Sequence, residues 1–212
     1  MFLPLLWCVG LAVTGFAQAP APGGAAKPYR VYAGAPAEEG SMMLKGARFC
    51  LKSGSTDVCW KFQDGLGGDP KADEVVATSG TKLYLVSATD VSGRDGDTGV
   101  VLLKLQGTKL VNVLPPITVS ASSVFAAWPV ASAGPLPLLV TGDQIWGPNE
   151  SRHDPHRFAI KVWAADGSGR YSLRFKYPTR GKLDNPSKLL AQEKPAILAR
   201  LRNGTIAPGA KH

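Results

Sequence analysis

Residues 157–177 read Arg-Phe-Ala-Ile-Lys-Val-Trp-Ala-Ala-Asp-Gly-Ser-Gly-Arg-Tyr-Ser-Leu-Arg-Phe-Lys-Tyr. Apolar and polar side chains alternate on both sides of the Asp-Gly-Ser-Gly turn, which is typical of a half-buried antiparallel hairpin. With residues 166–169 as the turn, one face is built from four apolar cross-strand pairs: Phe158 with Tyr177, Ile160 with Phe175, Val162 with Leu173 and Ala164 with Tyr171. The segment therefore predicts two adjacent strands with one face against a core.

The opposite face of this hairpin is basic and comprises Arg157, Lys161, Trp163, Arg170, Arg174 and Lys176. Neither strand contributes an acidic residue to it, and Lys161 is expected opposite Arg174, which costs stability unless water, an anion or a partner covers the pair. One hypothesis is a docking face for an anionic polymer, with Trp163 as a stacking platform. The alternative is a solvated edge hairpin whose cations discourage aggregation.

The same two-residue period recurs upstream, with turn signals every eight to twelve residues or so. It predicts an all-β fold of antiparallel hairpins, sandwich-like or partial propeller-like, over residues 29–184. The expected strands are 29–33, 47–52, 58–63, 74–78, 82–88, 99–106, 109–114, 118–125, 138–142, 157–165 and 170–177. Strands 99–106 and 109–114 flank a Gly107-Thr108 turn and are apolar on both faces, so we expect them to be a central, covered pair.

Strong helix signals come at the end of this sequence. Asn185-Pro186 is a good N-cap and first turn for a helix over 187–192. Pro195 is expected to interrupt that helix before a second piece that ends at Asn203-Gly204. We expect the helical segment 185–203 to pack on the sheet and residues 204–212 to form a loose tail.

Residues 1–17 have the features of a secretory signal peptide. An apolar run over 2–16 ends in small residues, and it is too short and too broken by Pro4 and Gly10 to span a bilayer. Residues 18–28 are rich in Pro, Ala and Gly and predict a flexible leader. We therefore expect an exported protein, periplasmic or secreted, with no stable membrane span once the signal is removed.

Export bears on the two cysteines that follow the signal, Cys50 and Cys59. An exported pair in an oxidising compartment should be bridged, and the segment between them looks like a hairpin that sets them opposite each other. Eight intervening residues fit neither a CxxC redox motif nor a zinc knuckle. We predict a structural disulfide.

The formal net charge of +8 is unevenly distributed. Residues 18–149 carry 11 Lys or Arg and 11 Asp or Glu, whereas residues 150–212 carry 13 and 5. A basic surface can attract many anionic partners. For an exported chain, the excess favours an anionic cell-envelope glycan or another exported protein over nucleic acid.

The segment 146–157 concentrates polar groups that could do chemistry: Glu150, His153, Asp154 and His156. Two histidines at this spacing with a carboxylate could ligate zinc, and His153 with Glu150 could act as an acid–base pair. Prolines at 148 and 155 prevent a helix from placing the histidines on one face. The alternative is an ordered loop in which Trp146 is buried and backbone groups satisfy the histidines.

Two acidic segments could hold calcium through carboxylate oxygens. The first, 64–76, resembles a degraded FG-GAP loop, the calcium-associated turn of integrin-type β-propellers, with Asp69 and Asp73 at its acidic positions. Gly67 and Pro70 replace the usual polar residue and glycine, which argues against calcium there. The second is 90–97, where plain turns are the simpler interpretation. Separately, segment 139–179 resembles uncharacterised exported bacterial β-rich proteins, a resemblance that implies no activity.

The sequence has no Gly-x-Ser-x-Gly elbow, P-loop or dinucleotide fingerprint. We expect a non-enzymatic exported β-domain protein without a cofactor, which binds an anionic envelope polymer or a protein surface through the basic hairpin 157–177. One alternative is a hydrolase or metal-dependent enzyme centred on the 146–157 loop. Another is a small inhibitor of an extracellular enzyme that uses a projecting loop such as 143–156.

Overall fold

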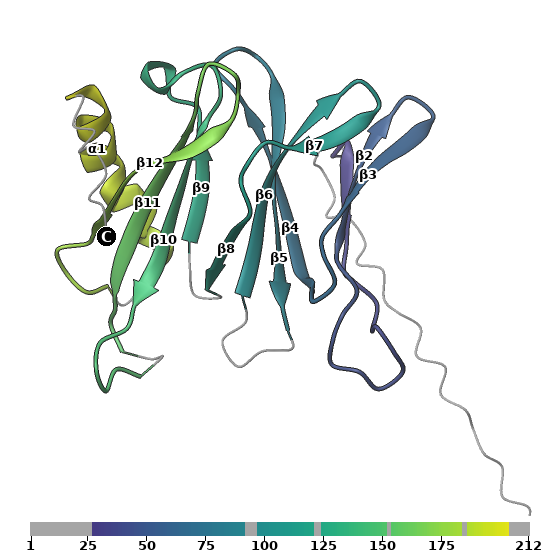
Figure 1. Cartoon of the computed structure of the whole chain (residues 1–212), viewed down its shortest axis with the longest axis horizontal. Coiled ribbons are helices and arrows are strands. Elements are labelled where there is room, and N and C mark those ends of the chain that lie inside the picture. Colours follow the sequence, from purple (N-terminus) through teal and green to yellow (C-terminus); the bar gives the residue numbers. More distant parts are fainter. Residues whose placement is uncertain (1–26, 92–96, 121–123, 152–153, 184–185, 204–212) are drawn as a thin grey trace, which may run out of the picture.

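Three antiparallel sheets and a C-terminal helix are stacked as successive layers (Figure 1). The computed structural model describes residues 27–91, 97–120, 124–151, 154–183 and 186–203. The N-terminal sheet has the order β1-β2-β3, with β1 (Tyr29–Tyr32), β2 (Arg48–Ser53) and β3 (Thr56–Lys61). The predicted all-β class with a C-terminal helix is confirmed, and the layers follow its sandwich-like form.

The other two sheets form the middle and the far side of the stack. The central sheet contains β4 (Leu66–Val76), β5 (Lys82–Asp90), β6 (Asp97–Gln106) and β7 (Lys109–Asn112), with β8 (Ile117–Ser120) also paired to β6. The C-terminal sheet has the order β12-β11-β10-β9. Its strands are β9 (Val124–Trp128), β10 (Leu138–Ile145), β11 (Arg157–Ala165) and β12 (Tyr171–Pro178).

The central sheet is covered on both faces, and its strands therefore lack polar alternation. On β5, Leu83 and Leu85 pack toward the C-terminal sheet, while Tyr84 and Val86 pack toward Phe49 of the N-terminal sheet. Strand β6 behaves in the same way, as predicted. Strand β7 pairs with β6, as predicted, but it is not covered on both faces: it is half-exposed at the end of the strand order, and β5 is the second central strand. The two-residue turn is confirmed, because Gln106 pairs with Lys109 around Gly107 at φ +60°.

The helix covers the outer face of the C-terminal sheet. A short 3-10 turn, η2 (Pro186–Lys188), leads into α1 (Leu189–Arg202), whose Leu189 and Ile197 are fully buried against that sheet. Gly142 permits this close approach, since a Cβ there would lie 2.7 Å from the Leu189 Cδ2 atom. The helix continues through Pro195 rather than breaking there, because the buried residues on both sides of the proline hold it to the sheet. The predicted N-cap Asn185 and the tail 204–212 lie outside the described residues.

The predicted strand 118–125 corresponds to two strands in different sheets, β8 and β9. The sequence between them has no Gly or Pro to mark the change of sheet, although Ser122-Ser123 interrupts the apolar alternation. Strand β4 begins eight residues before the predicted 74–78 and includes register shifts between Leu66 and Lys71. The FG-GAP-like segment is thus mostly strand: Asp69 pairs with Lys71, and Asp64 accepts hydrogen bonds from Gly46 N and Lys61 Nζ. Most of the second acidic segment, 92–96, is outside the described residues.

The predicted hairpin 157–177 forms, but its register is wrong. Ile160 lies opposite Tyr177 and Val162 opposite Phe175, with Ala165 opposite Tyr171. Asp166 closes a shorter turn than predicted: its N–H bonds Arg170 O at 2.8 Å, and Gly169 takes φ +83°. A β-bulge near Arg174 adds the remaining shift. Lys161 consequently lies opposite Lys176 rather than Arg174.

Candidate functional site

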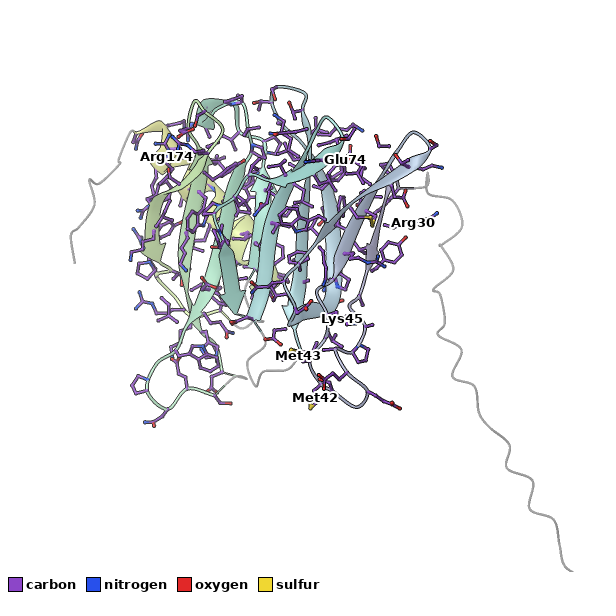
Figure 2. All side chains as sticks on the ribbon, turned by 45° about the vertical axis from the view of Figure 1, so that its right-hand side comes forward. Arg30, Met42, Met43, Lys45, Glu74 and Arg174 are labelled. Atoms are coloured by element: carbon purple, nitrogen blue, oxygen red, sulfur yellow. A yellow bond between two sulfur atoms is a disulfide. The ribbon has the colours of Figure 1, made fainter. Side chains whose placement is uncertain are left out.

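The outer edge of the C-terminal sheet and the adjoining helix carry a cluster of exposed cations. We call it the cationic edge and define it by Arg174, Lys176, Arg180 and Arg200. Within the described residues, none of the four has an acidic partner. Figure 2 shows Arg174 at the far side of the stack from Arg30 of the N-terminal sheet. Residues 171–203 carry eight Lys or Arg and two Asp or Glu, so the charge excess of the chain gathers here.

Packing of β12 against α1 orients this edge. Tyr177 donates a hydrogen bond to Glu193 Oε2 at 2.8 Å, and the Arg200 guanidinium lies 4.1 Å above the Tyr177 ring. Burial, and then the bond to Glu193, raises the pKa of Tyr177 well above its usual value. Glu193 is thereby engaged by a neutral hydroxyl rather than by a cation.

The chain turns sharply after β12 because of Thr179, which is 2% exposed. Its hydroxyl accepts a hydrogen bond from Phe158 N at 3.0 Å and donates one to Gly181 O at 2.9 Å. This turn sets Arg180 at the rim of a groove of about 510 Å³ between the end of β12 and α1. Its lining includes Tyr177, Gln192, Glu193 and Arg200. The groove gives a ligand on this edge both cations and hydrogen-bonding groups.

Of the six predicted anion-binding residues, two are exposed without an ion pair and four are paired, hydrogen-bonded or packed against the core. Arg174 and Lys176 are exposed on β12. Lys161 pairs with Asp143 at 2.8 Å, and Arg170 lies 3.8 Å from Asp166 at the hairpin turn. The two remaining residues are bonded or packed elsewhere: Arg157 donates to Thr179 O at 3.0 Å, and Trp163 packs against the core between two sheets. Neither hairpin strand contributes an acid to this face, but the neighbouring strand β10 brings Asp143 to Lys161.

Three lysines of the other sheets are paired, unlike the residues of the cationic edge. Lys61 lies 2.9 Å from Asp64, Lys71 lies 2.6 Å from Asp69, and Lys82 lies 2.9 Å from Glu74. These exposed pairs add little stability, but each one neutralises a charge locally. Arg30, Lys45, Lys52 and Lys109 are also exposed and have no ion pair among the described residues. The cationic edge is set apart instead by the excess of eight Lys or Arg over two Asp or Glu in residues 171–203.

The loop between β10 and β11 brings together two of the predicted chemical residues, Glu150 and His156. His156 is buried, and its Nδ1 lies 3.1 Å from Glu150 Oε2. Lys182 Nζ lies 2.5 Å from Glu150 Oε1, and Gly147 N donates to Oε2 at 2.7 Å. The Lys182 ammonium and then the Gly147 N–H lower the pKa of Glu150 to about 2. Glu150 is therefore an ionised acceptor at neutral pH.

This arrangement engages both nitrogens of His156. Its Nε2 lies 3.0 Å from Ser151 O, so both ring nitrogens face acceptors. Asp154 does not join the pair, since its carboxylate accepts from Ser151 N at 2.6 Å. His153 lies outside the described residues. Within the described part, no three His, Cys, Asp or Glu side chains gather as a possible metal site.

The same loop projects beyond the ends of the sheets (Figure 1). Trp146 is 49% exposed rather than buried, and its ring lies 4.6 Å from the His156 ring. The loop that precedes β2 leaves the stack at the same end, with exposed Met42 and Met43 at its tip (Figure 2). An internally bonded loop with an exposed indole is suited to contact with another protein.

The predicted disulfide is confirmed. Cys50 and Cys59 lie directly opposite each other on β2 and β3, with 4.1 Å between their Cα atoms. Their neighbours in sequence, Phe49 and Leu51, point the other way, into the core between the N-terminal and central sheets. The bond therefore lies on the outer face of the N-terminal sheet.

Sequence reasoning missed Arg180, Arg200 and the groove between them, since helix and strand meet only in the folded chain. The excess of Lys and Arg over residues 171–203 was the available signal. Comparison with protein-family models, with curated proteins and with solved structures found no match. Among the helices of the described residues, none has both the length and the apolar composition to cross a membrane.

Proposed function

We propose that this chain is an exported, non-enzymatic protein that binds an anionic polymer along the cationic edge. The observation that carries the proposal is the set of four exposed cations without acidic partners, within a segment, 171–203, that holds eight Lys or Arg and two Asp or Glu. Such a surface attracts anions over about a Debye length. Export is supported by the features of residues 1–17 and by the Cys50–Cys59 disulfide.

A polymer fits this edge better than a small anion does. The cations are exposed and spread over β12, the following turn and α1, so each single contact is weak. A small anion would need several donors converging in a closed pocket. A chain with regularly repeated phosphates, sulfates or carboxylates can contact several cations at once, and its total affinity then exceeds that of any one contact.

The experiment compares two triple variants that lose equal charge. Retention on heparin and polyphosphate columns is measured in a salt gradient for Arg174→Ser/Lys176→Ser/Arg180→Ser and for Lys61→Ser/Lys71→Ser/Lys82→Ser. We expect the first variant to elute at markedly lower salt than wild type and the second to elute close to wild type. Equal loss in both would mean that only net charge matters. Unchanged retention of the first variant would exclude the cationic edge.

A second candidate function rests on a different observation, the exposed Trp146 on its internally bonded loop. Glu150 contacts both Gly147 N and His156 Nδ1 near the two ends of that loop, and preordered contacts of this kind lower the entropy lost on binding. The candidate is inhibition of an extracellular enzyme, tested against a panel of secreted hydrolases. Inhibition abolished by Trp146→Ala but retained in Met42→Ala would support it. Absence of inhibition across the panel would remove it.

A further inference from the structure

The opposite flank of α1 forms a second groove, of about 520 Å³. One wall is the short turn that includes η1 (Ala131–Ala133), which contributes Val130 and Ser132. The other wall consists of helix residues at the spacing of a single stripe: Ala191, Lys194, Pro195, Leu198 and Arg202. No member of this set belongs to the cationic edge, so the two sites are distinct.

The groove combines an apolar surface with positive charge. Val130, Ala191, Pro195 and Leu198 present apolar surface, while Lys194 and Arg202 add two cations. No acidic residue lines it. The Lys194 ammonium lies 5.2 Å from the centre of the Trp128 ring, which places that cation beside the β9 end of the groove. An apolar floor with cations at its rim is complementary to a ligand with an apolar body and an anionic head.

Pro195 is a second observation that points to this groove. Proline is the least favourable residue for a helix interior, and the core does not require this one, because its side chain is exposed. Its ring adds rigid apolar surface to the groove wall. Proline also has no N–H to donate to the carbonyl of Ala191, four residues earlier. Departures from local preference of this kind are often found at functional sites.

We propose that the groove between η1 and α1 binds an anionic amphiphile, a molecule with one alkyl or acyl chain and an anionic headgroup. The alkyl chain lies along Val130, Pro195 and Leu198, and the headgroup contacts Lys194 and Arg202. The groove volume lies within the range of small-molecule sites. Because the two sites share no residue, this proposal does not depend on polymer binding at the cationic edge.

The test uses alkyl phosphates below their critical micelle concentrations, with affinity measured by titration calorimetry. Dodecyl phosphate is the probe, and inorganic phosphate and dodecyl maltoside are the controls for headgroup and chain. Each buried methylene contributes about fourfold in affinity, so dodecyl phosphate should bind up to about fifteenfold tighter than decyl phosphate. We expect weaker binding of dodecyl maltoside and no measurable binding of inorganic phosphate.

Two helix variants separate the groove from the rest of α1. Ala191→Phe fills the groove, and Ala196→Phe places the same ring on the opposite flank at another exposed alanine. We expect Ala191→Phe to weaken dodecyl phosphate binding at least about tenfold and Ala196→Phe to change it less than about twofold. Lys194→Ser/Arg202→Ser should weaken binding of dodecyl phosphate but not of dodecyl maltoside.

Three results would overturn the proposal. The first is no binding of dodecyl phosphate to the wild-type chain. The second is equal binding by Ala191→Phe and wild type, which would place the ligand elsewhere. The third is equal affinity for dodecyl maltoside and dodecyl phosphate, which would remove the role of the cations. Loss of polymer retention in the cationic-edge variant, with alkyl phosphate binding intact, would confirm that the sites are separate.

Discussion

Removal of the Cys50–Cys59 disulfide should destabilise the chain without unfolding it. The two cysteines are nine positions apart, and closing a loop of that length removes roughly 2.6 kcal/mol of unfolded-state entropy at 25 °C in the chain-entropy model. The hairpin β2–β3 is also held by packing on the central sheet, because Phe49 is fully buried and Leu51 is only 6% exposed in the core between the two sheets. We therefore expect Cys50→Ala/Cys59→Ala to be folded and less stable by about that amount.

The assay is urea denaturation followed by circular dichroism, with thermal melting as a second measure. For a domain of this size the loss corresponds to a fall in Tm of about 5–10 °C. Wild-type protein kept reduced by a phosphine is the control, since it loses the bond without any substitution. A loss below about 1 kcal/mol would refute the entropic reasoning. A loss above about 5 kcal/mol would show that the bond holds the N-terminal sheet in place.

Three further predictions concern stability. Glu150→Gln should lower Tm at neutral pH; because the folded-state pKa of Glu150 is about 2 against an ordinary 4.5, the wild-type advantage should hold above pH 4.5 and vanish as pH falls toward 2. A pH-independent difference would contradict this. Ile197→Ala should cost about 2–5 kcal/mol in urea denaturation, since the side chain is fully buried under the sheet, and a cost below about 1 kcal/mol would mean that α1 is not docked as described. Gly142→Ala should cost about 1–3 kcal/mol by pressing on Leu189, and the same substitution made in a Leu189→Ala background should cost less.

Alternation within the hairpin 157–177 was sufficient to predict its two strands but not their register. Register depends on the length of the turn and on bulges, and here Asp166 shortens the turn while the strand bulges near Arg174. Both features arise from local hydrogen bonding that leaves the apolar alternation unchanged. A similar limit explains the merged prediction for β8 and β9, because no Gly or Pro lies between residues 117 and 128 to mark the change of sheet.

The candidate site residues likewise separate into those that the local sequence predicts and those that only the folded structure brings together. Arg174 and Lys176 were identified because they lie on a predicted strand with a basic face. Lys161 lies on the same predicted face, yet Asp143 neutralises it from a strand that is adjacent only in the folded sheet. Arg180 lies beyond the end of the predicted strand, and the proximity of Arg200 to Tyr177 depends on how α1 crosses the sheet.

The sequence by itself determined the all-β class, the C-terminal helix, the disulfide and the concentration of positive charge in the last third of the chain. These follow from periodicity, spacing and composition, which are properties of neighbouring residues. Only the tertiary structure decided which cations are paired, that Glu150 meets Lys182 and His156, and that α1 has a groove on each flank. Such features depend on contacts between segments far apart in the chain, and no local pattern encodes which of those segments meet.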